Sequence, residues 1–315
     1  MMKDGAEGLG CDTLHQGDTP ATTARPRPSW FPVCSFPFES RYLRIGEASL
    51  HYVDEGDGPP LLLLHGNPTW SFLYRNLILE LRNEFRCIAP DLPGFGLSSA
   101  PKGFDFRPAS HAAVIGEFIR ALDLRSLIMM VQDWSGPIGL GAAVREPARF
   151  AGFIIGNTFA WSGKGDPHYE LFSRLMGGHI AGLLNRRFNF FVRVVIPMGM
   201  CRREASREIM RAYLGPFIQR EAREPLRIFP REIIASSDFL ENLAGNLKSI
   251  AHLPALIVWG DRDFAFRQKE RERFEAIFSD HVTVVLRGAG HFIQEDAPEE
   301  IARAIRHWSA AKVMN

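Results

Sequence analysis

The sequence predicts an α/β fold with a mostly parallel central sheet, helices on both faces of the sheet, and a helical cap inserted after the sixth strand. Three observations support this prediction. Short apolar runs alternate with segments of helical periodicity along most of the chain. One long segment, residues 161–230, contains no convincing strand. Polar residues follow the ends of several predicted strands, where parallel sheets bind their ligands.

The alternation begins with two short strands at residues 41–45 and 49–53, in which apolar and polar residues alternate on either side of Gly46. Residues 61–64 are four consecutive leucines, which suits a parallel strand buried on both faces. Further strands are predicted at residues 87–90, 127–131, 153–156, 255–260 and 282–286, and helices at residues 72–83, 108–122, 136–145 and 298–309. This order of elements predicts crossover connections and therefore a parallel sheet.

The break in the alternation defines the predicted domains. Residues 161–230 are rich in Phe, Met and Arg and form the predicted helical cap. Residues 30–160 and 231–315 form the predicted core on either side of it. Residues 1–29 contain no apolar segment of the kind found in secretory signals, and we expect them to be a flexible extension.

The composition excludes several classes of function. Apolar residues make up 46% of the chain and charged residues 23%, and the formal net charge is +1, which gives no indication of a nucleic-acid partner or of a membrane surface held by charge. No apolar run approaches the roughly 18 residues that span a bilayer. The four cysteines, Cys11, Cys34, Cys87 and Cys201, form no CxxC pair and no metal-binding spacing, so reduced thiols in a cytoplasmic protein are expected.

Three residues with catalytic side chains each come just after a predicted strand. Asp133 follows residues 127–131, Asp263 follows residues 255–260 and His291 follows residues 282–286. The carboxyl ends of parallel strands meet at one edge of the sheet, so these side chains are expected to lie together. Their order along the chain, nucleophile, acid and histidine, is the order found in α/β-hydrolases. The sequence therefore predicts a catalytic triad with Asp133 at a strand-to-helix turn.

Each member of the predicted triad has an alternative interpretation. Asp133 by itself is also a suitable N-cap for the helix that follows it. Ser135 is the alternative nucleophile, although no G-x-S-x-G pentapeptide surrounds it. Asp261 is the alternative acid, and Asp263 is preferred because the Gly-x-x-Asp spacing carries it past the strand end.

An aspartate nucleophile determines which chemistry is accessible. A carboxylate reacts poorly with amides and ordinary esters, but it displaces a leaving group from an sp³ carbon and forms an alkyl-enzyme ester. His291 would then activate water to hydrolyse that ester, and Asp263 would hold the imidazole and stabilise its charged form.

The motifs around these residues resemble those of the haloalkane dehalogenases. The resemblance extends from about residue 36 to residue 308 and rests on the motifs HGNPTW at residues 65–70, DLPGFGLS at residues 91–98 and QDW at residues 132–134, together with NFFV at residues 189–192 and YLGPF at residues 213–217. It implies an α/β-hydrolase fold with a helical cap over a buried apolar pocket. One departure is Ser135, at a position where the family commonly has Gly.

The resemblance also implies an activity and a site. The activity is hydrolytic cleavage of a carbon–halogen bond to give an alcohol, a halide ion and a proton, without a metal or an organic cofactor. The side chain of Asn67 and the indole of Trp134 would bind the halide, and the backbone amides of the same two residues would form an oxyanion hole. Asn157 stands near a position where some members carry an acidic Glu, so the acid is expected at Asp263, as in the subfamily usually called the third.

These expectations leave a defined set of partners. The expected partners are a small apolar halogenated substrate, water and a halide ion. No nucleic acid and no membrane is expected, and the sequence leaves open whether the chain forms a homo-oligomer. An epoxide hydrolase of the same fold is the nearest alternative function, and it would need two cap tyrosines, for which the segment offers only Tyr169 and Tyr213. A non-catalytic ligand-binding receptor of the same fold is the second alternative, against which the complete triad argues.

Overall fold

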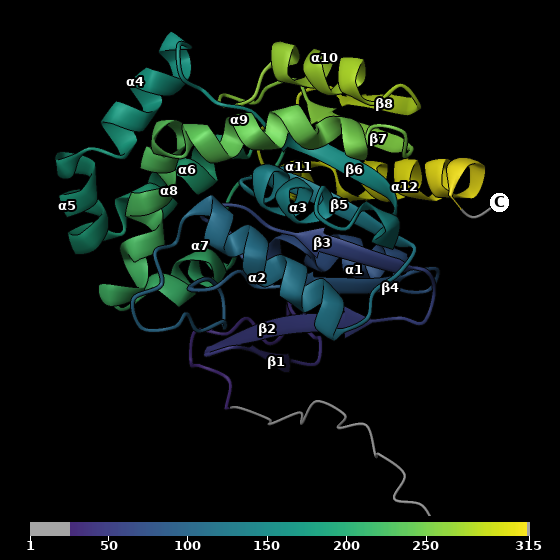
Figure 1. The fold of residues 1–315 in the computed structure, drawn as a ribbon. Helices are drawn as coiled ribbons and strands as arrows, with labels where there is room; N and C mark the ends of the chain where they lie inside the picture. Colours follow the sequence, from purple (N-terminus) through teal and green to yellow (C-terminus); the bar gives the residue numbers. More distant parts are fainter. Residues whose placement is uncertain (1–25, 314–315) are drawn as a thin grey trace, which may run out of the picture.

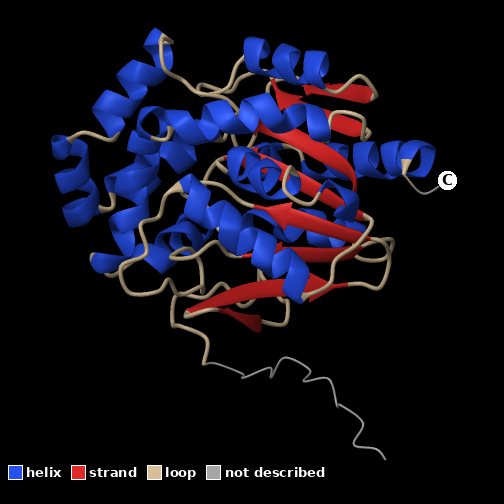
Figure 2. Cartoon of the chain, viewed as in Figure 1, coloured by secondary structure: helices blue, strands red, loops and turns tan. Residues whose placement is uncertain are grey.

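The computed structural model describes residues 26–313, which form an eight-stranded sheet with helices on both faces (Figures 1 and 2). The strand order is β1-β2-β4-β3-β5-β6-β7-β8. Strand β2 runs antiparallel to β1 and β4, and all other neighbouring strands are parallel. The strands are β1 (Arg41–Ile45), β2 (Ala48–Glu55), β3 (Pro60–Leu64), β4 (Arg86–Pro90), β5 (Leu127–Asp133), β6 (Phe150–Thr158), β7 (Ala255–Gly260) and β8 (His281–Leu286). The predicted α/β fold with a mostly parallel sheet is confirmed.

The central strands are apolar because helices cover both of their faces. Every residue of β5 and β7 is buried, as are the four leucines of β3. Helices α2 (Pro108–Ala121) and α3 (Ser135–Ala143) pack together on one face, and α1 (Arg75–Leu81) packs with α12 (Pro298–Lys312) on the other. The remaining core helices are α9 (Ser237–Asn246), α10 (Gln268–Ile277) and α11 (Ile293–Asp296).

The segment between β6 and β7 is helical, as expected for a cap inserted after the sixth strand. Its helices are α4 (Pro167–Met176), α5 (His179–Phe188), α6 (Phe190–Gly199), α7 (Arg207–Leu214) and α8 (Glu224–Ala235). They gather on one side of the molecule, at the left in Figure 1, next to the sheet edge where β5 ends. Helix α8 continues through residue 230, where the sequence places the end of the cap.

Two expectations concern parts of the chain at or beyond the described residues. The flexible extension predicted for residues 1–29 lies outside them except for residues 26–29, and Cys11 lies outside them entirely. Within residues 26–313, no helix is long and apolar enough to cross a membrane.

Candidate active site

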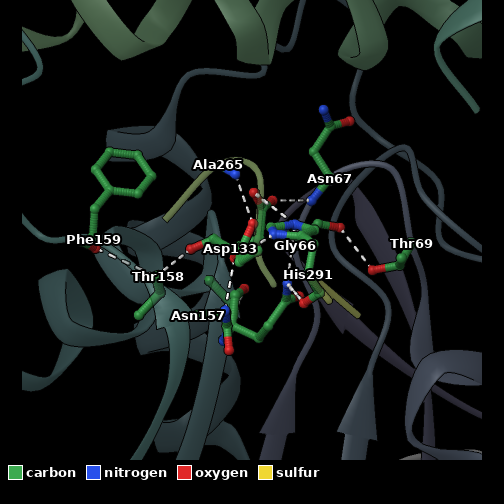
Figure 3. Close-up of polar contacts among 12 residues, drawn as sticks. Gly66, Asn67, Thr69, Asp133, Asn157, Thr158, Phe159, Ala265 and His291 are labelled. Carbon is green, nitrogen blue, oxygen red and sulfur yellow. Dashed lines mark hydrogen bonds and ion pairs between the residues drawn. The ribbon is translucent and has the colours of Figure 1, made fainter. Parts of the chain in front are cut away.

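Asp133 is the last residue of β5 and stands at a sharp turn into α3. Its φ is 54°, a left-handed conformation that costs free energy in a residue with a side chain. Neighbouring glycines make room for the turn. A Cβ on Gly66 would lie 2.4 Å from Oδ1 of Asp133, and one on Gly136 would lie 1.9 Å from Oγ1 of Thr158. The turn therefore presents the Asp133 carboxylate at the carboxyl edge of the sheet (Figure 3).

The Asp133 carboxylate is buried and faces two backbone N–H groups. The backbone nitrogen of Asn67 donates to Oδ1 at 2.6 Å, and the backbone N–H of Trp134 also donates to the carboxylate. Burial raises the pKa of Asp133 to about 6, against the opposing effects of His291 and the two backbone donors. The carboxylate is therefore ionised at neutral pH but poorly solvated, a state that suits a nucleophile.

His291 lies in the loop between β8 and α11 and contacts both acidic residues. Its Nδ1 is 3.0 Å from Oδ2 of Asp263, and its Nε2 is 3.6 Å from Oδ2 of Asp133. Burial lowers the pKa of His291, but Asp263, followed by Asp133, outweighs this effect and raises the pKa above its usual value. The longer distance exceeds a hydrogen bond, so the geometry suits activation of a water beside Asp133.

The structure distinguishes the two acids that the sequence offers as partners of the histidine. Asp263 is buried, and its Oδ1 accepts a hydrogen bond from the Ala265 backbone while Oδ2 faces His291. Asp261 is exposed, and its Oδ1 accepts a hydrogen bond from the backbone of Gly288. The structure thus brings together Asp133, His291 and Asp263 and leaves Asp261 outside the group.

Ser135, the alternative nucleophile, is buried with its hydroxyl directed away from the cavity. Its Oγ donates to the carbonyl of Leu64 at 2.6 Å and accepts from the backbone nitrogen of Gln132 at 2.7 Å. These bonds tie the elbow to the neighbouring strand β3. The hydroxyl therefore braces the turn in the position where the family commonly has Gly.

Two further polar residues belong to the site although the sequence analysis gave them no role in it. Asn157, in β6, donates from Nδ2 to Oδ2 of Asp263 at 2.7 Å and accepts from the backbone of Gly260 at 2.8 Å. Gln132 donates from Nε2 to the carbonyl of His291, and this nitrogen also lies 3.1 Å from Nε2 of the ring. A sequence signal existed for both: each is a polar side chain in or just after an apolar run that forms a central strand.

Asn67 and Trp134 line the same cavity as Asp133 and His291. The Asn67 side chain points away from the Asp133 carboxylate, toward the cap helices (Figure 3). Within residues 26–313, neither Nδ2 of Asn67 nor the indole nitrogen of Trp134 has a hydrogen-bond acceptor. The cavity thus contains two N–H donors that a bound anion or acceptor could occupy.

The rest of the cavity is narrow and mostly apolar, and His168 is an additional histidine of its lining. Side chains of the cap and of the core both line it. The cap contributes Tyr169, Phe172, Phe191, Val195, Pro230 and Ile233, and the core contributes Phe159, Phe264 and Phe266. Such a lining excludes water and strengthens electrostatic interactions inside the cavity.

Buried polar contacts hold the loops that carry these residues. Oδ1 of Asp91 accepts from the backbone of Ser71, and its Oδ2 lies 2.8 Å from Nδ1 of His51. In a second network, Glu295 accepts two hydrogen bonds from Arg75 and another from the hydroxyl of Tyr213 in the cap. The second network joins α1, α11 and α7 and so fixes the cap on the core.

The arrangement has the parts of a two-step hydrolytic site. It contains a buried carboxylate with one oxygen against two backbone N–H groups, an imidazole held by a second carboxylate, and two N–H donors in an apolar cavity. Among residues 26–313, no group of three or more His, Cys, Asp and Glu side chains is placed to hold a metal ion.

Comparisons with known proteins agree with this architecture. A family model described as the alpha/beta hydrolase fold matches residues 59–298. The chain is 45% identical over 272 residues to haloalkane dehalogenase 2 from Mycobacterium tuberculosis, a match that covers 86% of this chain and 94% of that protein. It is 31% identical over 281 residues to the cis-3-alkyl-4-alkyloxetan-2-one decarboxylase from Shewanella oneidensis, covering 86% and 88% of the two chains.

Solved structures show the same similarity in three dimensions. The crystal structure of a haloalkane dehalogenase from Bradyrhizobium elkani superposes with a TM-score of 0.79 at 28% sequence identity. The superposition covers 87% of this chain and 98% of that chain. The similarity therefore includes both the sheet and the inserted helices.

Proposed function

The chain belongs to the haloalkane dehalogenases of the α/β-hydrolase fold family, hydrolases that act on carbon–halogen bonds, and we propose that it cleaves short haloalkanes through an ester on Asp133. In the first step, Oδ2 of Asp133 attacks the carbon that carries the halogen. The carbon–halogen bond breaks, and the halide leaves with its electron pair. Asn67 Nδ2 and Trp134 Nε1 donate hydrogen bonds to the leaving halide.

The second step releases the alcohol and restores the carboxylate. His291 takes a proton from water, and the resulting hydroxide attacks the carbonyl carbon of the ester. The bond between that carbon and the alkyl oxygen then breaks, and the departing alkoxide takes the proton from the imidazolium and leaves as the alcohol. Asp133 then loses its proton to solvent and is a carboxylate again. The backbone N–H groups of Asn67 and Trp134 stabilise the negative charge on Oδ1, which already accepts from Asn67 at 2.6 Å. Asp263 stabilises the imidazolium until the proton leaves.

The observation that carries this proposal is the pair of unpartnered N–H donors beside a buried carboxylate. Neither nitrogen is among the fully buried unpartnered atoms of the described residues, so both are open to the cavity, where a released halide ion would accept from both. An ordinary ester or amide substrate needs no anion site at this point. The aromatic and aliphatic side chains that line the cavity favour a small apolar substrate.

The epoxide hydrolase alternative needs two cap tyrosines that protonate the epoxide oxygen, and only one of the two candidates is available. The Tyr213 hydroxyl donates to Glu295, outside the cavity lining. Tyr169 lines the cavity, and its buried hydroxyl has no hydrogen-bond partner among residues 26–313. A single available tyrosine supports epoxide opening less well than the two N–H donors support halide release.

The similarity to the Shewanella decarboxylase raises a second alternative. The substrate in that protein's name carries alkyl groups at two positions of an oxetanone ring. Aromatic and branched side chains of the cap and the core close the cavity on both sides and leave less room for two alkyl chains than for one. The narrow lining therefore favours a short haloalkane over such a substrate.

The direct test is a halide-release assay with 1-bromobutane, run beside epoxide-opening and β-lactone decarboxylation assays on the same protein. We expect bromide and proton release in equal amounts and little turnover in the other two assays. Faster epoxide opening or lactone decarboxylation than bromide release would overturn the proposal.

A further inference from the structure

The outer surface of the cap exposes an unusual number of large apolar side chains. Twelve such side chains are exposed in residues 26–313, and eight of them lie between residues 171 and 218. These are Leu171, Leu175, Ile180, Leu183, Phe188, Val194, Met198 and Ile218. Ile180 and Leu183 of α5 are the most exposed, at 79% and 65%. Leu171 and Leu175 of α4 and Ile180 and Leu183 of α5 lie on two helices that contact each other, and exposed apolar side chains on adjoining helices indicate an interaction surface.

A basic groove opens among the same helices. It lies between α4, α5 and α8, has a volume of about 860 Å³, and includes Leu183 in its lining. Six arginines line it: Arg174, Arg186, Arg220, Arg223, Arg227 and Arg231. Glu221 and Glu224 are the acidic residues of the lining, and Glu224 is paired with Arg227.

Most of this positive charge is not neutralised. In the part of the chain that the structure describes, Arg174, Arg186, Arg220 and Arg231 have no carboxylate within 4.0 Å. Burial, followed by repulsion from Arg220 and Arg193, lowers the pKa of Arg223. A groove in which arginines repel one another is an attractive site for an anion.

The charge of the whole chain conceals this asymmetry. Residues 161–230 contain twelve Lys and Arg against six Asp and Glu, a formal charge of +6, whereas the full chain has +1. The rest of the chain therefore carries a net charge of −5, of which the core, residues 30–160 and 231–315, accounts for −4. Opposite signs on the two parts orient the molecule in the field of a charged surface.

We propose that the cap docks on an anionic lipid bilayer, with lipid phosphates in the arginine groove and the exposed side chains of α4 and α5 in the acyl boundary. Exposed Leu and Ile beside Arg are the combination that binds anionic membrane interfaces. Helix α5 lies at the outer edge of the molecule (Figure 1). The neighbouring α4 carries Phe172 into the active-site cavity, so docking brings that cavity close to the layer where apolar molecules dissolve.

A second copy of the chain fits this surface less well. A symmetric dimer places the same patch against itself, which would bring two arginine grooves together. Like charges in such a contact repel each other, whereas lipid phosphates neutralise them. The charge therefore favours an anionic layer as the occupant of this face.

The test is flotation of the full chain with vesicles, without substrate, so the result does not depend on the reaction that the protein catalyses. We expect the protein to bind vesicles of equal parts phosphatidylglycerol and phosphatidylcholine. Its binding to vesicles of phosphatidylcholine alone should be weaker by roughly tenfold or more. Raising the salt from about 0.1 M to about 0.5 M should release the protein. Absence of binding, or equal binding to both vesicles, would overturn the proposal.

Paired variants separate the apolar and the basic parts of the surface. Ile180→Ser with Leu183→Ser, and Arg220→Gln with Arg231→Gln, should each weaken binding roughly tenfold or more. The matched controls Leu79→Ser and Arg145→Gln change exposed residues of the core and should bind like the original chain.

Two further measurements complete the experiment. Bromide release from 1-bromobutane without vesicles should be unchanged in both paired variants, because none of the four residues lines the active-site cavity. Light scattering after size-exclusion chromatography gives the oligomeric state. A dimer that Ile180→Ser with Leu183→Ser dissociates would assign this face to a second copy and overturn the proposal, as would wild-type vesicle binding in either paired variant.

Discussion

Nδ2 of Asn157 lies 2.7 Å from Oδ2 of Asp263, the same oxygen that faces Nδ1 of His291. Asn157, near the end of β6, thus holds the acid that follows β7. Asn157 also accepts a hydrogen bond from the Gly260 backbone, so it joins β6 to the end of β7. This contact keeps the Asp263 carboxylate aimed at the histidine.

We expect Asn157→Ala to slow the hydrolysis of the ester roughly tenfold to hundredfold, because Asp263 loses a charge-assisted hydrogen bond. The variant should also move the lower limb of the pH–rate profile to lower pH, because an Asp263 carboxylate that is no longer held beside His291 raises the pKa of the imidazole less. Single-turnover kinetics with 1-bromobutane measures both effects. Asn246→Ala, at the exposed end of α9, is the control. An unchanged pH profile in Asn157→Ala would reduce Asn157 to a structural role.

Replacement of the nucleophile should stabilise the folded protein. Burial raises the pKa of Asp133 from 3.8 to about 6, so between these pH values the folded protein holds a proton that the unfolded chain has lost. Stability therefore falls as pH rises through this window, and the full cost is present above pH 6. We expect Asp133→Asn to raise the free energy of unfolding at neutral pH by about 1–3 kcal/mol.

Urea denaturation at several pH values tests this expectation. The gain from Asp133→Asn should shrink as the pH falls from 6 toward 3.8, and it should vanish below 3.8, where the carboxyl group of the original chain is protonated in both states. Asp57→Asn, at an exposed carboxylate, should leave stability nearly unchanged at every pH. A loss of stability in Asp133→Asn at neutral pH would contradict the burial argument.

Replacement of the histidine should stop the reaction at the ester. His291→Gln keeps the Asp133 nucleophile but removes the group that activates water. After incubation with 1-bromobutane, the mass of the intact protein should increase by one butyl group. The double variant Asp133→Ala with His291→Gln should show no adduct. An unmodified His291→Gln protein would argue against the covalent step.

The halide donors should contribute to the first step alone. Asn67→Ala and Trp134→Phe each remove one N–H from the leaving halide, and we expect ester formation to slow roughly tenfold to thousandfold in each. Rapid-quench measurement of bromide release separates this step from hydrolysis. Unchanged bromide release in Asn67→Ala would favour the epoxide alternative. Melting temperatures of both variants show whether the fold is retained.

Tyr213 should contribute to stability and not to the reaction. Tyr213→Phe leaves the buried Glu295 carboxylate with Arg75 as its side-chain partner, and we expect a loss of about 1–3 kcal/mol in the free energy of unfolding. Bromide release at low temperature should persist, because the hydroxyl lies outside the cavity lining. Loss of bromide release from a folded Tyr213→Phe protein would show that this hydroxyl takes part in the chemistry.

Much of the fold and the core of the site follow from the sequence. Apolar runs of strand length, separated by helical periodicity, predict a parallel sheet, because each such strand must be covered on both faces. Asp133, Asp263 and His291 all follow predicted strands, and parallel strands end at one edge. Their meeting is therefore a consequence of chain order and strand direction, which are local properties of the sequence.

Choices between near neighbours depended on tertiary contacts. Asp261 and Asp263 are two residues apart in one turn. Only the packing against β6 and β8 directs Asp263 to His291 and Asp261 to the backbone of Gly288. Likewise, the Ser135 hydroxyl has the right residue type for a nucleophile, but its hydrogen bond to Leu64 across the sheet occupies it.

The cap shows most clearly which properties follow from the sequence and which depend on the tertiary structure. The sequence by itself determined that residues 161–230 are helical and rich in arginine, since periodicity and composition are read along the chain. Only the tertiary structure decided that six arginines from α4, α5 and α8 and the segment before α8 line one groove, and that Tyr213 points to Glu295 and not to Asp133. Both results depend on how helices far apart in sequence pack together. The direction of a side chain relative to another element is a property of that packing and not of the local sequence.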